Sequence, residues 1–293
     1  MSAPKPSWRF RPGEVVDGRA IEACLGGGST YEVYAATVLS RFGLAMRSEI
    51  GKERMVVVKY LRPHVVSNER SLIRLRRETR LVQRLHHSDA VRLVDAVLEG
   101  PRPHLVLERV PGPSLRARLR EGPIPIDEAI ALGARLADQL AYLAHRHVVH
   151  LDVKPSNVIF GPRPTLIDFS VAREISAAAR LTKPVGTDIW MAPEQCVAGK
   201  GGAIGSAADV WGLGTTLWRA LLGKPPFKRL SDYDRNDPLQ RFPQLSSRPR
   251  PLPPHVPPAF GSLLVACLRV EASSRPTSEE LAEALAALQP VAA

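Results

Sequence analysis

One short segment constrains this chain more than any other, because it gathers charged and amide side chains on two neighbouring loops. The segment reads His150-Leu151-Asp152-Val153-Lys154-Pro155-Ser156-Asn157, and Asp168-Phe169-Ser170 begins eleven residues after its last residue. Asn157 and Asp168 carry hard oxygen ligands that suit Mg²⁺. Asp152 can orient a hydroxyl group and accept its proton, and Lys154 can neutralise charge on a phosphoryl group in transfer. The pattern therefore predicts phosphoryl transfer from ATP to a hydroxyl.

Further motifs occur in an order that resembles the bacterial branch of the eukaryotic-like (Hanks-type) serine/threonine protein kinases. The resemblance covers about residues 14–289. Each motif is weak alone, so the resemblance depends on their agreement in order and spacing. They are Leu25-Gly26-Gly27-Gly28 through Val33, Val56-Val57-Val58-Lys59, Arg77-Glu78, Gly186-Thr187, Met191-Ala192-Pro193-Glu194, Asp209-Val210-Trp211-Gly212-Leu213-Gly214 and Arg275-Pro276.

The resemblance implies an α+β fold with two lobes, a small β-rich N-lobe with one helix and a larger, mainly helical C-lobe. We expect a flexible segment over residues 1–12, the N-lobe over 13–109 and the C-lobe over 110–289, all within one kinase domain. The implied cofactors are ATP and Mg²⁺, with Mn²⁺ as an alternative metal. The implied partners are proteins with Ser or Thr hydroxyls, and autophosphorylation is expected.

The resemblance also assigns a role to each candidate site residue. Asn157 and Asp168 would bind the metal. The glycines of the loop let backbone N–H groups approach phosphates without Cβ clashes. The six catalytic residues would be Lys59, Glu78, Asp152, Lys154, Asn157 and Asp168. The nucleotide would contact Gly26, Gly27, Gly28, Val33, Val57, Lys59, Leu107, Glu108, Val110 and Ile159.

Lys59 follows three valines that must be buried, so its ammonium group needs an acidic partner. Glu78 is the best candidate, and the resemblance implies that the pair holds the α- and β-phosphates. A rival interpretation pairs Glu78 with Arg74 on the surface of one helix.

Other residues are expected to support the site. The resemblance implies that His150, Phe169 and Val82 stack in the active state. It further implies that Asp209 holds the catalytic loop and that Glu194 and Arg275 form a buried ion pair.

Four residues depart from the family pattern. Tyr31 occupies the place of the third loop glycine and should make the loop tip bulkier. Val57 replaces a common alanine. Ser170 replaces the glycine after Phe169, which removes backbone freedom. Leu151 replaces the arginine that usually precedes the catalytic aspartate Asp152. This removes a docking site for a phosphate on the activation segment, which the resemblance places at Phe169–Glu194.

Composition narrows the class of protein. Hydrophobic residues make up 44% of the 293 residues, and the formal net charge is +11. A basic chain can bind polyanions, but no aromatic–basic interleaving or helix-turn-helix pattern is visible, which argues against a nucleic-acid partner. The three cysteines are too few for a disulfide framework, which favours a reducing, cytoplasmic location.

No run of the sequence approaches the roughly 20 apolar residues that span a bilayer. We expect either a cytoplasmic kinase without a sensor domain or a piece of a longer protein. The sequence leaves the oligomeric state open.

Periodicity and punctuation predict the main elements. Strands are expected between Val15 and Tyr60 and again at His104–Arg109, with an insertion over residues 40–54. Helical spacing is expected from Asn68 to Leu85, between Ser206 and Gly223, and after a capping box at residues 277–280. Asp127 is expected to cap a further helix. Residues 248–254 are proline-rich and form either a connector or a polyproline ligand.

Three rival functions stay open. The first is a pseudokinase scaffold that binds nucleotide or a partner without efficient phosphotransfer. The second is a small-molecule phosphotransferase of the same fold, and the third is a basic module that binds polyanions. The complete set of catalytic residues argues against the first of these.

Overall fold

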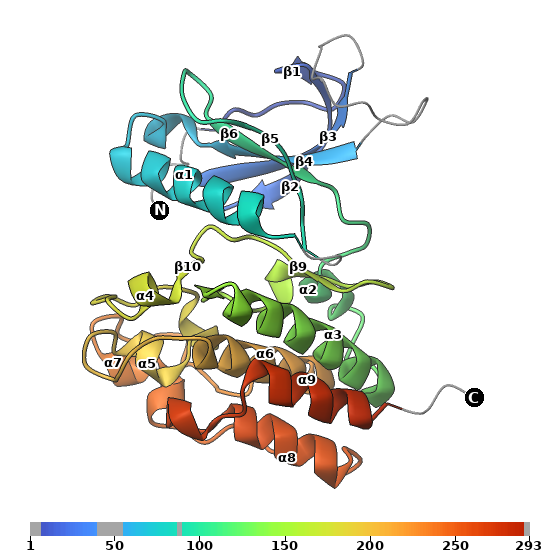
Figure 1. Cartoon of the computed structure of the whole chain (residues 1–293), viewed down its shortest axis with the longest axis vertical. Coiled ribbons are helices and arrows are strands. Elements are labelled where there is room, and N and C mark those ends of the chain that lie inside the picture. The colour runs from blue at the N-terminus through green and yellow to red at the C-terminus, as the bar shows by residue number, and fades with distance from the viewer. Residues whose placement is uncertain (1–6, 40–54, 87–89, 290–293) are drawn as a thin grey trace. The chain divides into compact units, whose positions relative to one another are not determined.

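The computed structural model describes residues 7–39, 55–86 and 90–289 (Figure 1). The chain forms two compact units. The first contains the residues up to His86 together with Val91–Val110, and the second takes in the chain from Pro111 onward. The insertion expected over residues 40–54 lies outside the described residues.

The first unit is built on a six-stranded antiparallel sheet with the strand order β1-β2-β3-β4-β6-β5. The strands expected before Tyr60 and at residues 104–109 are thereby confirmed. Successive side chains of a strand point to opposite faces, and β4 shows this alternation: Val56, Val58 and Tyr60 are buried in one apolar cluster. The strands are β1 Val15–Val16, β2 Arg19–Gly27, β3 Tyr31–Val38, β4 Met55–Leu61, β5 Leu93–Val97 and β6 His104–Glu108.

The N-terminal segment, where it is described, packs against that apolar cluster. Trp8 donates its indole N–H to the carbonyl of Leu61 at 2.7 Å. The Phe10 ring lies 5.3 Å from the Tyr34 ring and 5.2 Å from the Tyr60 ring, measured between centroids. Trp8 and Phe10, which belong to the segment over residues 1–12 that we expect to be flexible, are thus partly buried against the sheet.

Helix α1, Glu69–Arg84, packs against β5 and β6. Asn68 caps it by accepting a hydrogen bond from the backbone N–H of Ser71 at 3.1 Å. The helical spacing expected over this segment is confirmed, since Leu75, Thr79 and Val82 are buried along one side of the helix. The short helix η1, Pro63–Val65, precedes α1.

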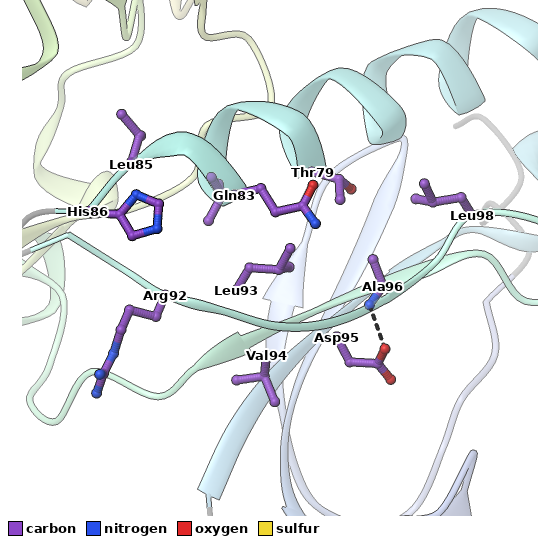
Figure 2. A pocket seen from close by; sticks show the side chains of 11 residues that line it. Thr79, Gln83, Leu85, His86, Arg92, Leu93, Val94, Asp95, Ala96 and Leu98 are labelled. Carbon is purple, nitrogen blue, oxygen red and sulfur yellow. Dashed lines mark hydrogen bonds between the residues drawn. The ribbon is translucent and has the colours of Figure 1, made fainter. Parts of the chain in front are cut away.

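A cavity of about 550 Å³ lies between the C-terminal half of α1 and β5 (Figure 2). Leu93 and Ala96 face the helix from β5, and Gln83 extends toward them from above. The Asp95 carboxylate accepts a hydrogen bond from the backbone N–H of Ala96 at 2.8 Å and pairs with buried Arg19 at 2.6 Å. The cavity is therefore lined by residues of the first unit alone, and neither Lys59 nor Glu78 lines it.

The second unit is mainly helical, and its core is the helix α6, Ala207–Leu222, which is buried on nearly all sides. Helix α3, Ile126–His145, packs against α6 and α9, and α8 packs against α6 (Figure 1). The other helices are α2 Leu115–Arg118, α4 Ile175–Ala178, α5 Pro193–Cys196, α7 Pro238–Arg241, α8 Pro258–Cys267 and α9 Ser278–Ala287. The short strands are β7 Val148–Val149, β8 Val158–Ile159, β9 Thr165–Leu166 and β10 Arg173–Glu174.

Three of the expected helix boundaries in the second unit are confirmed. Ser206 and Gly223 flank α6, and Gly223 adopts the left-handed conformation that favours glycine, with φ of 67°. Thr277 and Glu280 form the capping box of α9.

The cap expected at Asp127 is wrong. Helix α3 starts one residue before Asp127, and the carbonyl of Pro125 already accepts the N–H of Ala129 at 2.9 Å. Asp127 thus lies in the first turn, where its charge is favourable for the helix dipole.

The proline-rich stretch over residues 248–254 is held against its own unit. The indole N–H of Trp218 donates to the carbonyl of Arg250 at 3.1 Å, and the Arg250 N–H donates to the carbonyl of Pro226 at 2.8 Å. These bonds favour the connector over the polyproline ligand.

Candidate active site

The register of the sheet places several candidate nucleotide residues on one face. Val33 pairs with Gly26 on β2 and with Lys59 on β4, and Val57 pairs with Leu107 on β6. Paired residues share a face. These residues therefore lie on the side of the sheet opposite the apolar cluster that contains Val56, Val58 and Tyr60.

Lys59 and Glu78 form a buried ion pair between β4 and α1. The Lys59 ammonium donates to both carboxylate oxygens of Glu78, at 2.8 and 3.1 Å. The Glu78 side chain is only 1% exposed. Burial excludes the rival interpretation in which Glu78 forms a surface bridge with Arg74, and the pair meets the need of a buried ammonium group for an acidic partner.

Tyr31 lies beside this pair instead of at the tip of the glycine loop. It is the first residue of β3 and 8% exposed, and the Lys59 Nζ lies 4.4 Å from the centroid of its ring. The expected bulk at the loop tip is therefore wrong. Because Tyr31 shares the face of Lys59, its ring provides a cation–π contact with the ammonium group.

The glycine loop connects β2 to β3 and depends on backbone conformations that other residues avoid. Gly26 and Gly27 have φ of 127° and 154°. A Cβ on Gly27 would lie 2.4 Å from the carbonyl oxygen of Tyr31. The Gly28 N–H closes the turn by donating to the same carbonyl at 3.1 Å. Glycine is thus required here for close backbone approach.

The remaining nucleotide candidates are divided between the two units. Glu108 ends β6, and its carboxylate forms a bidentate pair with Arg92 at 2.6 and 3.0 Å. Val110 closes the first unit. Ile159 belongs to the second unit, where it forms an isolated bridge with Ser114.

In the second unit, the hairpin of β8 and β9 brings Asn157 and Asp168 to the same end. Val158 pairs with Leu166, and the Ile167 N–H donates to the carbonyl of Asn157 at 2.8 Å. Asp168 follows directly and has a left-handed backbone with φ of 67°. A non-glycine residue in this conformation stores strain, which is common at functional sites.

Asp152 is the centre of a hydrogen-bonded network that joins its side chain to those of three other residues. Lys154 Nζ donates to Asp152 Oδ2 at 2.6 Å and to Thr187 Oγ1 at 2.6 Å. Thr187 Oγ1 donates in turn to Asp152 Oδ1 at 2.7 Å. Asn157 Nδ2 donates to Asp152 Oδ2 at 3.1 Å. The structure thus brings together three of the predicted catalytic residues, and it confirms the prediction that Thr187 of the Gly186-Thr187 motif contacts Asp152.

Asp209 holds the loop that carries Asp152. Its carboxylate accepts the backbone N–H groups of His150 and Leu151, each at 2.7 Å. The expected role of Asp209 is confirmed. His150 packs edge-on against Phe169 with 5.0 Å between ring centroids, and burial lowers the pKa of the His150 imidazole. A neutral ring fits its bonds: Nδ1 accepts from the Asp152 N–H, and Nε2 donates to the carbonyl of Ile167.

The expected ion pair of Glu194 and Arg275 is also present. The guanidinium group donates to both carboxylate oxygens at 2.7 and 2.8 Å. It also donates to the backbone carbonyls of Arg269, Ala207 and Val270. The buried guanidinium group of Arg275 therefore has hydrogen-bond acceptors on all three nitrogens, and the ion pair fixes the start of α5.

A metal site at Asn157 and Asp168 fits the chemistry of Mg²⁺. Among the described residues, no cluster of three or more His, Cys, Asp or Glu could hold a metal by itself. Mg²⁺ commonly takes one or two protein oxygens together with water and substrate phosphates. Asn157 Nδ2 is engaged by Asp152, so its Oδ1 is oriented away from that carboxylate. A two-ligand site is consistent with this metal.

Comparison with known proteins gives the family. The family model described as the protein kinase domain matches residues 41–285. The chain belongs to the protein kinase family. It is 34% identical over 273 residues to the serine/threonine-protein kinase PkaA of Streptomyces coelicolor, covering 90% of this chain and 49% of that protein. It is 32% identical over 290 residues to the serine/threonine-protein kinase pkn2 of Myxococcus xanthus, covering 93% of this kinase chain and 33% of that protein.

This kinase chain therefore spans half the length of such relatives or less. Within the part that the structure describes, no helix combines the length and the apolar character that crossing a membrane requires.

Sequence reasoning missed Gln195, a buried residue of α5. Its amide bonds to the catalytic loop and to the activation segment. The available signal in the sequence was a second polar residue, Gln195, directly after Glu194 of the Ala192-Pro193-Glu194 motif.

Proposed function

We propose that this chain transfers the γ-phosphoryl group of ATP to Ser or Thr hydroxyls of proteins, including its own. The observation that carries the proposal is the bonded network of Asp152, Lys154, Asn157 and Thr187. It holds an acceptor for a hydroxyl proton beside a cation in one fixed arrangement.

The chain's own residues would divide the work as the network suggests. Asp152 would orient the hydroxyl and accept its proton, which is general-base catalysis. Lys154 would neutralise charge that develops on the phosphoryl group. Lys59, held by Glu78, would position the phosphates of the nucleotide.

The cofactors of the proposal are ATP and Mg²⁺, with Mn²⁺ as an alternative metal. Asn157 and Asp168 would hold the metal. When bound, the ion supplies positive charge that bridges and neutralises phosphate oxygens. The glycine loop would contact the phosphates through its N–H groups, and Val33, Val57, Leu107, Glu108, Val110 and Ile159 would surround the base.

Two features support Ser and Thr on proteins as acceptors. Lys154 and Thr187, the residues that the family resemblance links to Ser and Thr acceptors, both bond to the Asp152 carboxylate. The ion pair of Glu194 and Arg275 stabilises the segment that would hold a peptide, which a small-molecule phosphotransferase would not need. Among the described residues, no observation favours a pseudokinase scaffold that lacks phosphotransfer. The cytoplasmic location predicted from the sequence stays part of the proposal.

The test is Mg²⁺-dependent autophosphorylation and phosphorylation of a generic Ser/Thr peptide mixture by the purified chain. Lys59→Met, Asp152→Asn and Asp168→Asn should each lower the rate by at least about a hundredfold, because positioning and charge neutralisation supply most of the catalysis.

Arg74→Met on the exposed side of α1 is the matched control and should keep the wild-type rate. Equal incorporation of phosphate by the wild type and by Asp168→Asn would contradict the proposal and would favour the scaffold.

A further inference from the structure

The backbone of Leu151 is held from both sides although its side chain is apolar. Leu151 has a left-handed backbone with φ of 66°, which is strained for a leucine. Its N–H donates to Asp209 Oδ1 at 2.7 Å, and its carbonyl accepts from Gln195 Nε2 at 3.0 Å. Two buried side chains from different helices thus fix the residue directly before Asp152.

The Gln195 amide connects three backbone groups and uses its full donor capacity. Its Nε2 also donates to the carbonyl of Val185 at 2.8 Å, and its Oε1 accepts from the Ala192 N–H at 2.9 Å. The residue is 2% exposed. Val185 and Ala192 delimit the end of the activation segment that carries Thr187, so one side chain joins that segment to the catalytic loop.

Gly186 shows how closely the two segments approach each other there. A Cβ on Gly186 would lie 2.6 Å from the carbonyl oxygen of Leu151 and 3.3 Å from Gln195 Nε2. The activation segment is therefore seated directly on the bonds that Gln195 makes. One residue further along, Thr187 reaches Asp152.

We infer that Gln195 is a positioning residue that seats the activation segment on the catalytic loop, and that it replaces a phosphate in this role. In kinases that are regulated by phosphorylation of this segment, an arginine before the catalytic aspartate binds the added phosphate and orders the segment. Leu151 occupies that place here and cannot bind phosphate. The three bonds of Gln195 reach the same two segments without any modification. This inference rests on the proposed function, since it concerns the same reaction.

Gln195→Met tests the inference, because methionine has a similar length and makes none of the three bonds. The dephosphorylated variant should lose at least about thirtyfold in kcat, with KM for ATP within about twofold of wild type, since Gln195 contacts no candidate nucleotide residue. Gln195→Asn keeps an amide on a side chain that is too short to reach both carbonyls. The kcat of this variant should lie between those of the wild type and Gln195→Met.

Gln139→Met is the matched control. Gln139 is also a buried bridging amide: it donates to the carbonyl of Pro164 at 2.7 Å and accepts from the Leu166 N–H at 2.9 Å. It should lose comparable thermal stability but leave hydrogen exchange of residues 181–192 unchanged, because none of its bonds reaches Leu151 or the activation segment.

A second measurement does not need turnover. Hydrogen exchange of residues 181–192, recorded in an Asp168→Asn background without phosphate, should be at least about tenfold faster with Gln195→Met than without it. If the wild type shows no kinase activity, the proposed function fails while this measurement still decides the inference. The inference is overturned if kcat stays within about threefold in a folded Gln195 variant, or if exchange is unchanged. It is equally overturned if both Gln195 variants fail to fold while Gln139→Met folds, because the role would then be stability alone.

Discussion

At the scale of single residues, Asp209 is almost completely buried and binds the catalytic loop directly through its carboxylate. Burial raises the pKa of its carboxyl group to about 7, while the N–H groups of His150 and Leu151 oppose that rise. The ionised carboxylate accepts both N–H groups well. A protonated carboxyl would turn one of its oxygens into a donor and weaken one of the two bonds.

The raised pKa of Asp209 predicts how the folding stability depends on pH. Between the unfolded value of 3.8 and the folded value of about 7, the folded chain binds a proton that the unfolded chain has released. The contribution of Asp209 to folding stability is therefore lost as pH rises through this window. Relative to Asp209→Asn, the wild type should lose up to about 1.4 kcal/mol of unfolding free energy per pH unit.

Denaturant titrations of both proteins at about pH 5, 6 and 7 would measure this difference. A difference that stays constant across the three pH values would show that the carboxyl is already ionised at the lower end.

At the scale of elements, the activation segment is anchored by several contacts that involve no phosphate. Besides the bonds of Gln195, the Asp188 carboxylate pairs with Arg241 at 3.0 and 3.1 Å, and Gln244 donates to the carbonyl of Asp188 at 2.6 Å. Ser176 and Thr182 are exposed in the same segment.

We therefore predict that phosphate on the exposed hydroxyls has little influence on rate. Ser176→Ala and Thr182→Ala, singly or together, should keep peptide phosphorylation within about threefold of wild type, which is below roughly 1 kcal/mol of barrier. Phosphatase treatment should likewise leave turnover nearly unchanged.

Arg173, Arg180 or Lys183 could bind such a phosphate in place of the missing arginine. A hundredfold loss in the double variant, with an unchanged circular dichroism spectrum, would show that one of them does.

The elements also show how far the sequence predicts this structure. Strands, the helix boundaries at Ser206, Gly223 and Thr277, and the partner of Lys59 follow from periodicity, capping chemistry and motif spacing. The position of Tyr31 did not, because the face on which a side chain lies depends on the strand register. Gln195 was not predicted either, because its role depends on carbonyl groups that approach it only in the folded chain.

At the scale of the whole molecule, the division into two compact units should be visible in unfolding. Trp8→Ala should destabilise the sheet-bearing unit by about 1–3 kcal/mol, since it removes a partly buried ring and its hydrogen bond to the carbonyl of Leu61. Leu281→Ala, which removes a buried side chain of α9, should destabilise the helical unit by about 2–4 kcal/mol.

Hydrogen exchange resolved by segment would separate these effects, because each variant should accelerate exchange mainly in its own unit. Equal acceleration across both units by either variant would show a single cooperative unit instead.

The distribution of the three thiols has a practical consequence. Cys196 and Cys267 are buried, and burial raises the pKa of the Cys267 thiol to about 12, whereas Cys24 is exposed on β2. Thiolate is the form that reacts with alkylating reagents, so a maleimide dye should attach to the native chain at Cys24 alone. Cys24 stands two residues before Gly26 in the strand that leads into the glycine loop. A fluorophore there would report nucleotide binding by the unaltered sequence, without any engineered cysteine.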